Sequence, residues 1–435
     1  MKILNDLRYT AWRLVEGFKK DSVYKRLKRI ERIMADDKLY AAHLDKKLSQ
    51  LLNFASRNIR YYEKIKYNAG KLHLEDFPVI NKNTIMDDMT LFQCQKYDHS
   101  KLHTMATSGS TGRPFKITQD IGKRKQVLAE VLYFTNIMGY RPGKKLVYLR
   151  NQEGAFTKSK FKSFLQNEDV IMTRMYDDET LSKIVRQIAS MEKGTTILGY
   201  ASTLQCIASY LDRHKQILTN ITGVISGAET LNHKTRELVL KQFSSPVVSR
   251  YSNQEMGILA QESQEDEFVL NRASYYFELL HVDKDEPVKE GEIGRIVITD
   301  LYNYATPLIR YDTGDLGIMG RDSNGRLVMS KICGRKLDLL YTTKNEPISF
   351  FALDEFFEQN YDLDQYQIIQ ESRYDFTLNL IVKEGRTVDE DEFVRNIQSV
   401  MGADSRVKVV YLKTVPITAS GKFRYVICNY KPSNA

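Results

Sequence analysis

The sequence predicts an α/β protein of two domains, because the chain is long and because short apolar runs alternate with amphipathic segments through its centre. Its 435 residues exceed the about 250 to 300 residues that one hydrophobic core usually supports. Hydrophobic residues make up 42% and charged residues 27%, as in an ordinary folded protein. We therefore expect a large α/β domain followed by a smaller α+β domain.

The first 65 or so residues are expected to be helical, with a basic start. Residues 1–32 hold ten Lys or Arg and four acids, a net charge of +6 within a total of +9. Val23, Leu27, Ile30 and Met34 recur at helical spacing beneath these charges, which indicates an amphipathic basic helix. This helix could pack on the main domain with its charges in water, or dock on an anionic membrane surface or an acidic partner. We expect no nucleic acid, because no nucleic-acid module accompanies the charge.

Strands and helices alternate from about residue 123. Short apolar runs predict the strands, and apolar residues three or four positions apart predict the helices. This alternation implies parallel strands with crossover connections, whose carboxyl ends collect ligands at one edge of a sheet. The predicted strands are 145–150, 195–200, 221–227 and 246–252, and the predicted helices are 123–138, a helix after Asp177 and Asp178, 204–218 and 231–243.

After about residue 267 the pattern becomes β-rich, with one late helix near 389–400. The segment CGRKLD, at 333–338, is the expected boundary, so that residues 1–334 form the large domain and 335–435 the small one. The N-terminus lacks the apolar region of a signal peptide, and no run approaches about 18 apolar residues. The four cysteines lie far apart without metal-site spacing. These observations predict a cytoplasmic protein.

The segment MATSGSTGRPFKITQD, at 105–120, combines glycines, hydroxyls and cations. Glycines let backbone amides close around an anion, hydroxyls add donors, and cations supply charge, so a triphosphate fits this loop. The Walker A pattern does not fit, because its second glycine would fall at Pro114. The residues concerned are Thr107, Ser108, Gly109, Ser110, Thr111, Gly112, Arg113 and Lys116.

The segment TSGSTGRPFK resembles the phosphate-binding signature of the adenylate-forming superfamily, which includes acyl-CoA synthetases, peptide-synthetase adenylation domains and luciferases. Five further segments resemble motifs of this superfamily in the same order, so the resemblance covers residues 105–424. It is greatest to the branch of phenylacetate-CoA ligases, deazaflavin-adenylylating synthetases and ligase-like proteins of capsule loci. SGAE (226–229) and YSNQEMG (251–257) look like the superfamily's adenine and magnesium segments, RYDTGD (310–315) like its ribose-binding segment, GRKLD (334–338) like its hinge, and PITASGKFR (416–424) like its C-terminal lysine motif.

The resemblance implies a role for each segment. The loop from Thr107 to Lys116 would hold the β- and γ-phosphates of ATP, and Glu255 would bind Mg²⁺, which usually takes one or two protein carboxylates plus phosphate oxygens. Lys422 would be the catalytic lysine of the small, mobile C-terminal domain. The remaining nucleotide-binding residues would be Gly227, Ala228, Glu229, Tyr251, Ser252, Asp315 and Arg335, and the acyl pocket would include Tyr200, Ala201 and Ser202.

Some of these residues have plainer alternatives, and two segments depart from the superfamily's pattern. Tyr251 could be a core residue, and Asp315 and Arg335 could form a surface ion pair. Leu337 stands where an acidic hinge residue is usual in the superfamily. This change places the second step, transfer of the acyl group to an acceptor, in more doubt than the first step, adenylation of the acid. Ser252 replaces a glycine, which is a milder change.

The implied activity is the ATP-dependent adenylation of a carboxylic acid with release of pyrophosphate, followed by acyl transfer to CoA, a carrier protein or another acceptor. A carboxylate is already ionised at pH 7, so adenylation needs positioning and charge stabilisation rather than a general base. The acyl-pocket segment contains no acid to hold an ammonium group, which favours a substrate that is not an amino acid. The alternatives are a nucleotidyltransferase that adenylylates a hydroxyl, and a non-catalytic ATP-binding scaffold in a polysaccharide-biosynthesis complex.

Overall fold

The computed structural model forms two compact units. The larger contains residues 1–292, 296–313 and 319–331, and the smaller contains 293–295, 314–318 and 332–435. The structure describes residues 2–65, 71–107, 115–150, 163, 166–173, 176–263, 267–335, 339–349, 353, 356–357, 362–383, 385–412 and 425–430.

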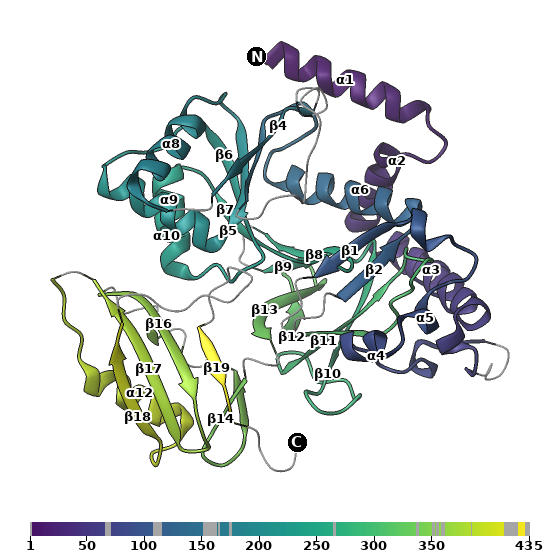
Figure 1. Cartoon of the computed structure of the whole chain (residues 1–435). Helices are drawn as coiled ribbons and strands as arrows, with labels where there is room; N and C mark the ends of the chain where they lie inside the picture. The colour runs from purple at the N-terminus through teal and green to yellow at the C-terminus, as the bar shows by residue number, and fades with distance from the viewer. Residues whose placement is uncertain are drawn as a thin grey trace. The chain divides into compact units, whose positions relative to one another are not determined.

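Helices form the N-terminal part of the larger unit (Figure 1). Ser22 caps the second helix by accepting a hydrogen bond from the Lys25 N–H, and Asp36 caps the third by accepting from the N–H groups of Lys38 and Leu39. No helix in the described part of the chain has the length and apolar character needed to cross a membrane. The N-terminal helices are α1 (Lys2–Phe18), α2 (Val23–Ala35), α3 (Asp37–Asn58), α4 (Lys82–Asp87) and α5 (Met89–Phe92).

The apolar side of α2 is buried. Leu27, Ile30 and Met34 belong to a core cluster that also contains Ala129 and Phe134 of helix α6 (Ile121–Ile137). The sequence left open whether these apolar residues pack on the main domain or contact a membrane. In the structure they are packed within the larger unit.

An 11-stranded sheet runs in the order β10-β11-β12-β13-β9-β8-β7-β6-β5-β3-β4. The strands from β3 to β7 are parallel to their neighbours, and the pairs β7–β8, β8–β9 and β9–β13 are antiparallel. The first strands of this sheet are β3 (Leu146–Arg150), β4 (Glu168–Met172), β5 (Thr195–Tyr200), β6 (Ile221–Gly227) and β7 (Val247–Asn253). The others are β8 (Gly257–Glu262), β9 (Phe268–Leu270), β10 (Tyr275–Leu280), β11 (Ile293–Asp300), β12 (Tyr311–Arg321) and β13 (Leu327–Arg335).

Crossover helices connect the parallel strands, which confirms the predicted α/β class. Val147, Ile197 and Val224 are completely buried on successive strands, as expected where helices cover a parallel sheet. Strands β8–β13 extend the sheet beyond the parallel part that the sequence pattern indicated, and the pairs β8–β9 and β9–β13 among them are antiparallel. The crossover helices are α8 (Asp178–Ala189), α9 (Ala201–Arg213) and α10 (His233–Phe243).

A separate antiparallel pair, β1 (His103–Thr107) and β2 (Phe115–Gln119), precedes α6. Thr107 pairs with Phe115, so the two strands carry the two ends of the predicted phosphate loop. The two ends of the predicted loop therefore lie side by side in the larger unit.

The smaller unit has an α+β arrangement. Its four-stranded sheet has the order β18-β17-β16-β19, in which only β16 and β17 are antiparallel neighbours. Phe393 and Ile397 of its helix pack with Ile368 and Leu378 of the sheet. Its elements are β14 (Leu339–Tyr341), β15 (Pro347–Ser349), β16 (Leu363–Gln370), β17 (Asp375–Val382), α12 (Glu390–Met401), β18 (Arg406–Tyr411) and β19 (Val426–Cys428).

Candidate nucleotide and acid site

The carboxyl ends of β5, β6 and β7 lie side by side in the sheet. Tyr200 pairs with Gly227, and Gly227 pairs with Arg250 on the next strand. The three segments that follow these residues are the predicted acyl-pocket, adenine and magnesium segments. The sheet therefore brings all three to one edge, where α/β folds bind their ligands.

A direct hydrogen bond links two of these segments. The Ser202 N–H, in the first turn of α9, donates to Glu229 Oε2 at 2.9 Å. Tyr200 precedes this helix and makes no side-chain capping bond, so the Glu229 carboxylate satisfies a free N–H and faces the positive end of the helix dipole. The adjoining Ala228 has a φ of +66°, in the left-handed region that non-glycine residues rarely occupy. Such strain recurs at functional sites, and here it accompanies the turn that presents Glu229.

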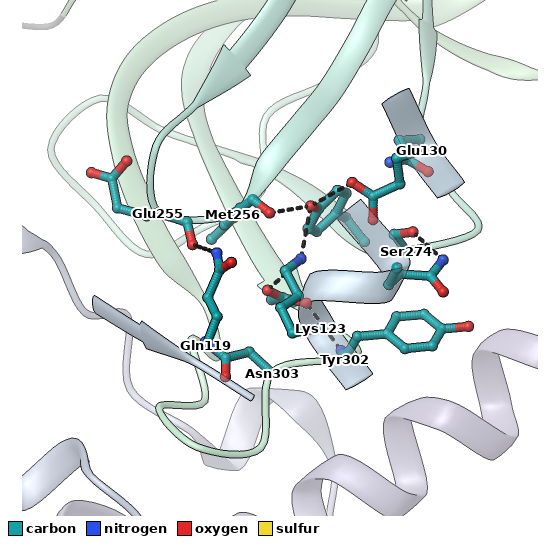
Figure 2. Close-up of polar contacts among 12 residues, drawn as sticks. Gln119, Lys123, Glu130, Glu255, Met256, Ser274, Tyr302 and Asn303 are labelled. Carbon is teal, nitrogen blue, oxygen red and sulfur yellow. Dashed lines mark hydrogen bonds and ion pairs between the residues drawn. The ribbon is translucent and has the colours of Figure 1, made fainter. Parts of the chain in front are cut away.

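The turn after β7 carries Glu255 and contacts the phosphate-loop strands. Gln119, the last residue of β2, donates from Nε2 to the backbone oxygen of Glu255 at 2.9 Å (Figure 2). The Glu255 carboxyl group extends away from this contact, and Tyr311 donates its hydroxyl hydrogen to Glu255 Oε1 at 3.4 Å. The base of the phosphate loop is thus bonded to the backbone of the predicted magnesium residue, and Tyr311 contacts its carboxylate.

The other predicted nucleotide residues fall in two places. The Tyr251 hydroxyl donates to Thr313 Oγ1 at 3.3 Å, within the larger unit. In the smaller unit, Arg335 Nε lies 3.8 Å from Asp315 Oδ1, with the side chain of Asp315 17% exposed and that of Arg335 62% exposed. The ion pair that the sequence allowed between these two residues is therefore present.

The chain resembles known proteins both in its C-terminal part and over most of its length. Residues 340–429 match the family described as the CapK C-terminal domain. Over 411 residues the chain is 24% identical to Protein CapK of Staphylococcus aureus, which covers 89% of each chain.

Solved structures extend the likeness to the whole fold. A 2-hydroxyisobutyryl-CoA ligase in its postadenylation state, in complex with 2-HIB-AMP, has a TM-score of 0.71 at 18% identity over 90% of each chain. ATP-bound MatB of Rhodopseudomonas palustris has a TM-score of 0.56 at 16% identity, over 75% of this chain and 67% of its own. The fold is that of the adenylate-forming ligases. The resemblance of the sequence to that superfamily, and to its capsule-locus branch, is confirmed.

Within this adenylate-forming fold, several predicted residues lie outside the described part of the chain. Thr107 ends β1, and Lys116 is exposed on β2 between the buried Phe115 and Ile117. Lys116 is therefore placed to face solvent beside the loop. The predicted residues outside the described part are Ser108, Gly109, Ser110, Thr111, Gly112, Arg113, Leu337 and Lys422.

The magnesium role predicted for Glu255 does not require a preformed cluster of metal ligands. Among the described residues, no group of three or more His, Cys, Asp or Glu side chains is close enough to hold a metal ion. Mg²⁺ bound to ATP needs only one or two carboxylates in addition to phosphate oxygens. The half-buried Glu255 is suited to this, since its carboxyl group takes no part in the contact that fixes its backbone.

Three further residues lie near the start of α9, close to the residues predicted for the acid pocket. The hydroxyl groups of Tyr176 and Thr203 are hydrogen-bonded at 2.9 Å. Cys206 lies one helical turn after Ser202, and burial, reinforced by the nearby Glu229 carboxylate, raises the pKa of its thiol to about 11. Cys206 is therefore protonated at neutral pH and unsuited to act as a nucleophile. None of these three residues belongs to a recognisable sequence motif, so their position near the start of α9 could be learned only from the structure.

A buried ionic network, which no sequence motif indicated, lies next to the Glu255 turn (Figure 2). Lys123 Nζ is 2.8 Å from Asp300 Oδ2 and donates to the Tyr275 hydroxyl oxygen at 2.9 Å. Tyr275 in turn donates to the Met256 backbone oxygen at 2.8 Å, and its oxygen lies 3.2 Å from Glu130 Oε2. Burial raises the pKa of Glu130 to about 7, against the opposing effect of Lys123. The network thus anchors the residue that follows Glu255.

Replacing Glu229 with alanine is expected to lower the free energy of unfolding by about 1 kcal/mol, the usual cost of losing a helix cap. The reason is that the Ser202 N–H would lose its acceptor at the start of α9. Urea unfolding measures the loss. Glu229→Gln keeps an acceptor oxygen and should recover part of the difference, whereas equal losses in both variants would show that the hydrogen bond contributes nothing.

Proposed function

We propose that this protein is an ATP-dependent acid ligase, which adenylates a carboxylic acid, releases pyrophosphate and passes the acyl group to CoA or another acceptor. The observation that carries the proposal is the meeting of the three motif segments at the ends of β5, β6 and β7, joined by the bond from Ser202 to Glu229. CoA as acceptor is supported by the 2-hydroxyisobutyryl-CoA ligase, whose fold this chain resembles.

In the proposed reaction a carboxylate oxygen of the acid attacks the α-phosphorus of ATP, and the bond to pyrophosphate breaks. Tyr200, Ala201 and Ser202 line the acid pocket at the start of α9, where the positive end of the helix favours an anion. Tyr251 would lie by the adenine, and Asp315 would accept hydrogen bonds from the ribose. Glu255 would hold Mg²⁺, which would supply charge neutralisation at the phosphates, and Gln119 fixes the Glu255 turn to the phosphate-loop strands.

The acid is proposed not to be an amino acid. The Glu229 carboxylate contacts the predicted pocket segment, but one of its oxygens already caps α9, so it is poorly placed to hold a substrate ammonium group. The relation to CapK favours a role in capsular polysaccharide biosynthesis. Because the reaction consumes ATP, the proposed location is the cytoplasm.

Pyrophosphate release from ATP and Mg²⁺, measured across aryl, fatty, hydroxy and amino acids, tests the proposal. We expect release that depends on one class of acid, with an acyl-adenylate as the product in the absence of acceptor. Release that requires a hydroxyl compound rather than an acid would instead identify a nucleotidyltransferase. ATP binding without any release would identify a scaffold.

In the same assay, Glu255→Gln should raise the Mg²⁺ concentration needed for half-maximal release by roughly tenfold or more, since a charged ligand is replaced by a neutral one of equal size. Folding should be retained, because the contact with Gln119 uses the backbone oxygen of Glu255. Glu237→Gln, which neutralises an exposed carboxylate on α10, is the matched control. An unchanged Mg²⁺ requirement in Glu255→Gln would remove Glu255 from the metal site.

A further inference from the structure

The first helix presents an apolar face to solvent. Its large apolar residues recur at intervals of three, four and seven positions, which places them along one side of a helix. Their exposed fractions run from 46% to 88%. Contiguous apolar surface of this kind marks an interaction site. The residues are Ile3, Leu4, Leu7, Leu14, Val15 and Phe18, and we refer to them as the α1 apolar face.

The opposite side of α1 holds the helix to the larger unit through polar contacts. Asn5 Nδ2 donates to both carboxylate oxygens of Glu192, at 3.0 and 3.1 Å. Asp6 forms an ion pair with Arg141, whose guanidinium lies 4.7 Å from the centroid of the Tyr9 ring. A helix on the surface of a protein normally buries its apolar side and exposes its polar side. In α1 the apolar side is exposed to solvent, and the polar side contacts the protein.

The inner side of α1 makes close contacts with the larger unit, and these contacts determine which side of the helix faces solvent. Gly143 has a φ of +96°, and a Cβ atom there would lie 2.5 Å from the Asn5 backbone oxygen. Only glycine therefore allows the chain to approach α1 this closely. Trp12 adds an edge-to-face contact with Tyr24 of α2, with ring centroids 5.7 Å apart. Figure 1 shows α1 at the edge of the larger unit.

The acids of α1 are engaged, whereas exposed cations remain on or next to the helix. Asp6 pairs with Arg141, and Glu16 is buried, where it pairs with Lys19 and accepts from the Val23 N–H at 2.9 Å. Lys2 and Arg13 of α1, and Lys20 just after it, are exposed. An exposed apolar helix face with cations nearby matches a lipid surface with anionic headgroups. A second copy of the chain would instead bring like charges together.

We propose that α1 docks the protein on an anionic membrane surface, with the α1 apolar face inserted among the lipids and the nearby exposed cations attracting the anionic headgroups. The sequence pattern pointed to the apolar residues of α2 as a possible membrane contact, but those residues are buried. The docking does not depend on the proposed ligase chemistry.

Sedimentation with unilamellar vesicles tests the proposal. The full-length protein should bind phosphatidylcholine vesicles that contain about 30% phosphatidylserine, and should bind them less as salt rises from about 50 to 500 mM. The triple variant Leu7→Ser, Leu14→Ser, Phe18→Ser should lower the partition coefficient by about 100-fold or more, since three large apolar groups leave the lipid. These residues are exposed, so folding should be retained. The matched control is Ile217→Ser, Leu240→Ser, Leu327→Ser, which alters three exposed apolar residues outside α1.

The triple variant Lys2→Gln, Arg13→Gln, Lys20→Gln should weaken binding and flatten its salt dependence, because it removes the attraction to the headgroups. The proposal is overturned if wild-type protein does not bind these vesicles at low salt, or if the serine variant of α1 binds as well as wild type. Light scattering, which measures the oligomeric state, distinguishes membrane docking from self-association through the α1 apolar face. A wild-type dimer that the serine variant of α1 converts to monomer would assign the face to a second copy and would also overturn the proposal.

Discussion

Replacing Lys422 with alanine should lower the rate of pyrophosphate release by roughly two to three orders of magnitude, because removal of one charge that stabilises a transition state costs about 3 to 4 kcal/mol. Lys422 lies in TASGKFR, the segment that resembles the superfamily's C-terminal lysine motif. During adenylation, negative charge moves onto the departing pyrophosphate. An ammonium group that reaches both the α-phosphate and the acid carboxylate brings the two anions together and stabilises that change.

The variant should separate chemistry from nucleotide binding. ATP binding should be largely retained, because the proposed phosphate and adenine contacts lie in the larger unit, and transfer from a chemically synthesised acyl-adenylate should also be retained. Lys408→Ala removes an exposed lysine from β18 of the smaller unit and serves as the matched control. Adenylation at the wild-type rate by Lys422→Ala, measured with the true acid, would contradict both the role of the lysine and the two-step mechanism.

The parallel core could be predicted from the sequence because its strands are covered on both faces. Such strands are continuous apolar runs, and β5 and β6 have the bounds that their runs indicated. The candidate site followed from the same pattern, since Tyr200 and Gly227 directly end those runs. When a parallel strand can be predicted from its apolar run, the residues that follow its carboxyl end can be predicted as candidate ligand-binding residues.

Other features could not be predicted, because they depend on partners distant in the chain. Lys123 lies among charged residues in IGKRKQ, a pattern typical of a solvated helix surface, yet it is completely buried. Its partner Asp300 is far away in the sequence. The periodicity of α1 likewise predicts that one side is apolar, but it does not determine which side contacts the protein. That choice depends on Gly143, Glu192 and Arg141, which belong to distant segments.

Replacing Lys123 with methionine should lower the free energy of unfolding by about 3 to 5 kcal/mol, the usual cost of leaving one member of a buried ion pair without its partner. Methionine is close in length to lysine, so the change removes charge more than volume. Asp300 would keep the Tyr302 N–H, which donates to Oδ1 at 3.0 Å, but would lose its cation. Tyr275, which bonds the Met256 backbone next to Glu255, would lose the lysine that orders it. Denaturant unfolding measures the loss, and an enlarged Mg²⁺ requirement should accompany it.

Glu130→Gln is the matched control in the same network, because it removes a negative charge at constant size. The pKa of Glu130 is raised by burial from its ordinary 4.5 to about 7, so between these values the folded protein holds a proton that the unfolded chain has released. Its contribution to stability therefore falls as pH rises through this window. Wild type should lose stability from about pH 5 to 7.5, and Glu130→Gln should lose less over the same range, while Lys123→Met should be destabilised throughout. Wild-type stability in Lys123→Met, or an unaltered pH profile in Glu130→Gln, would show that the network does not act as an ionic unit.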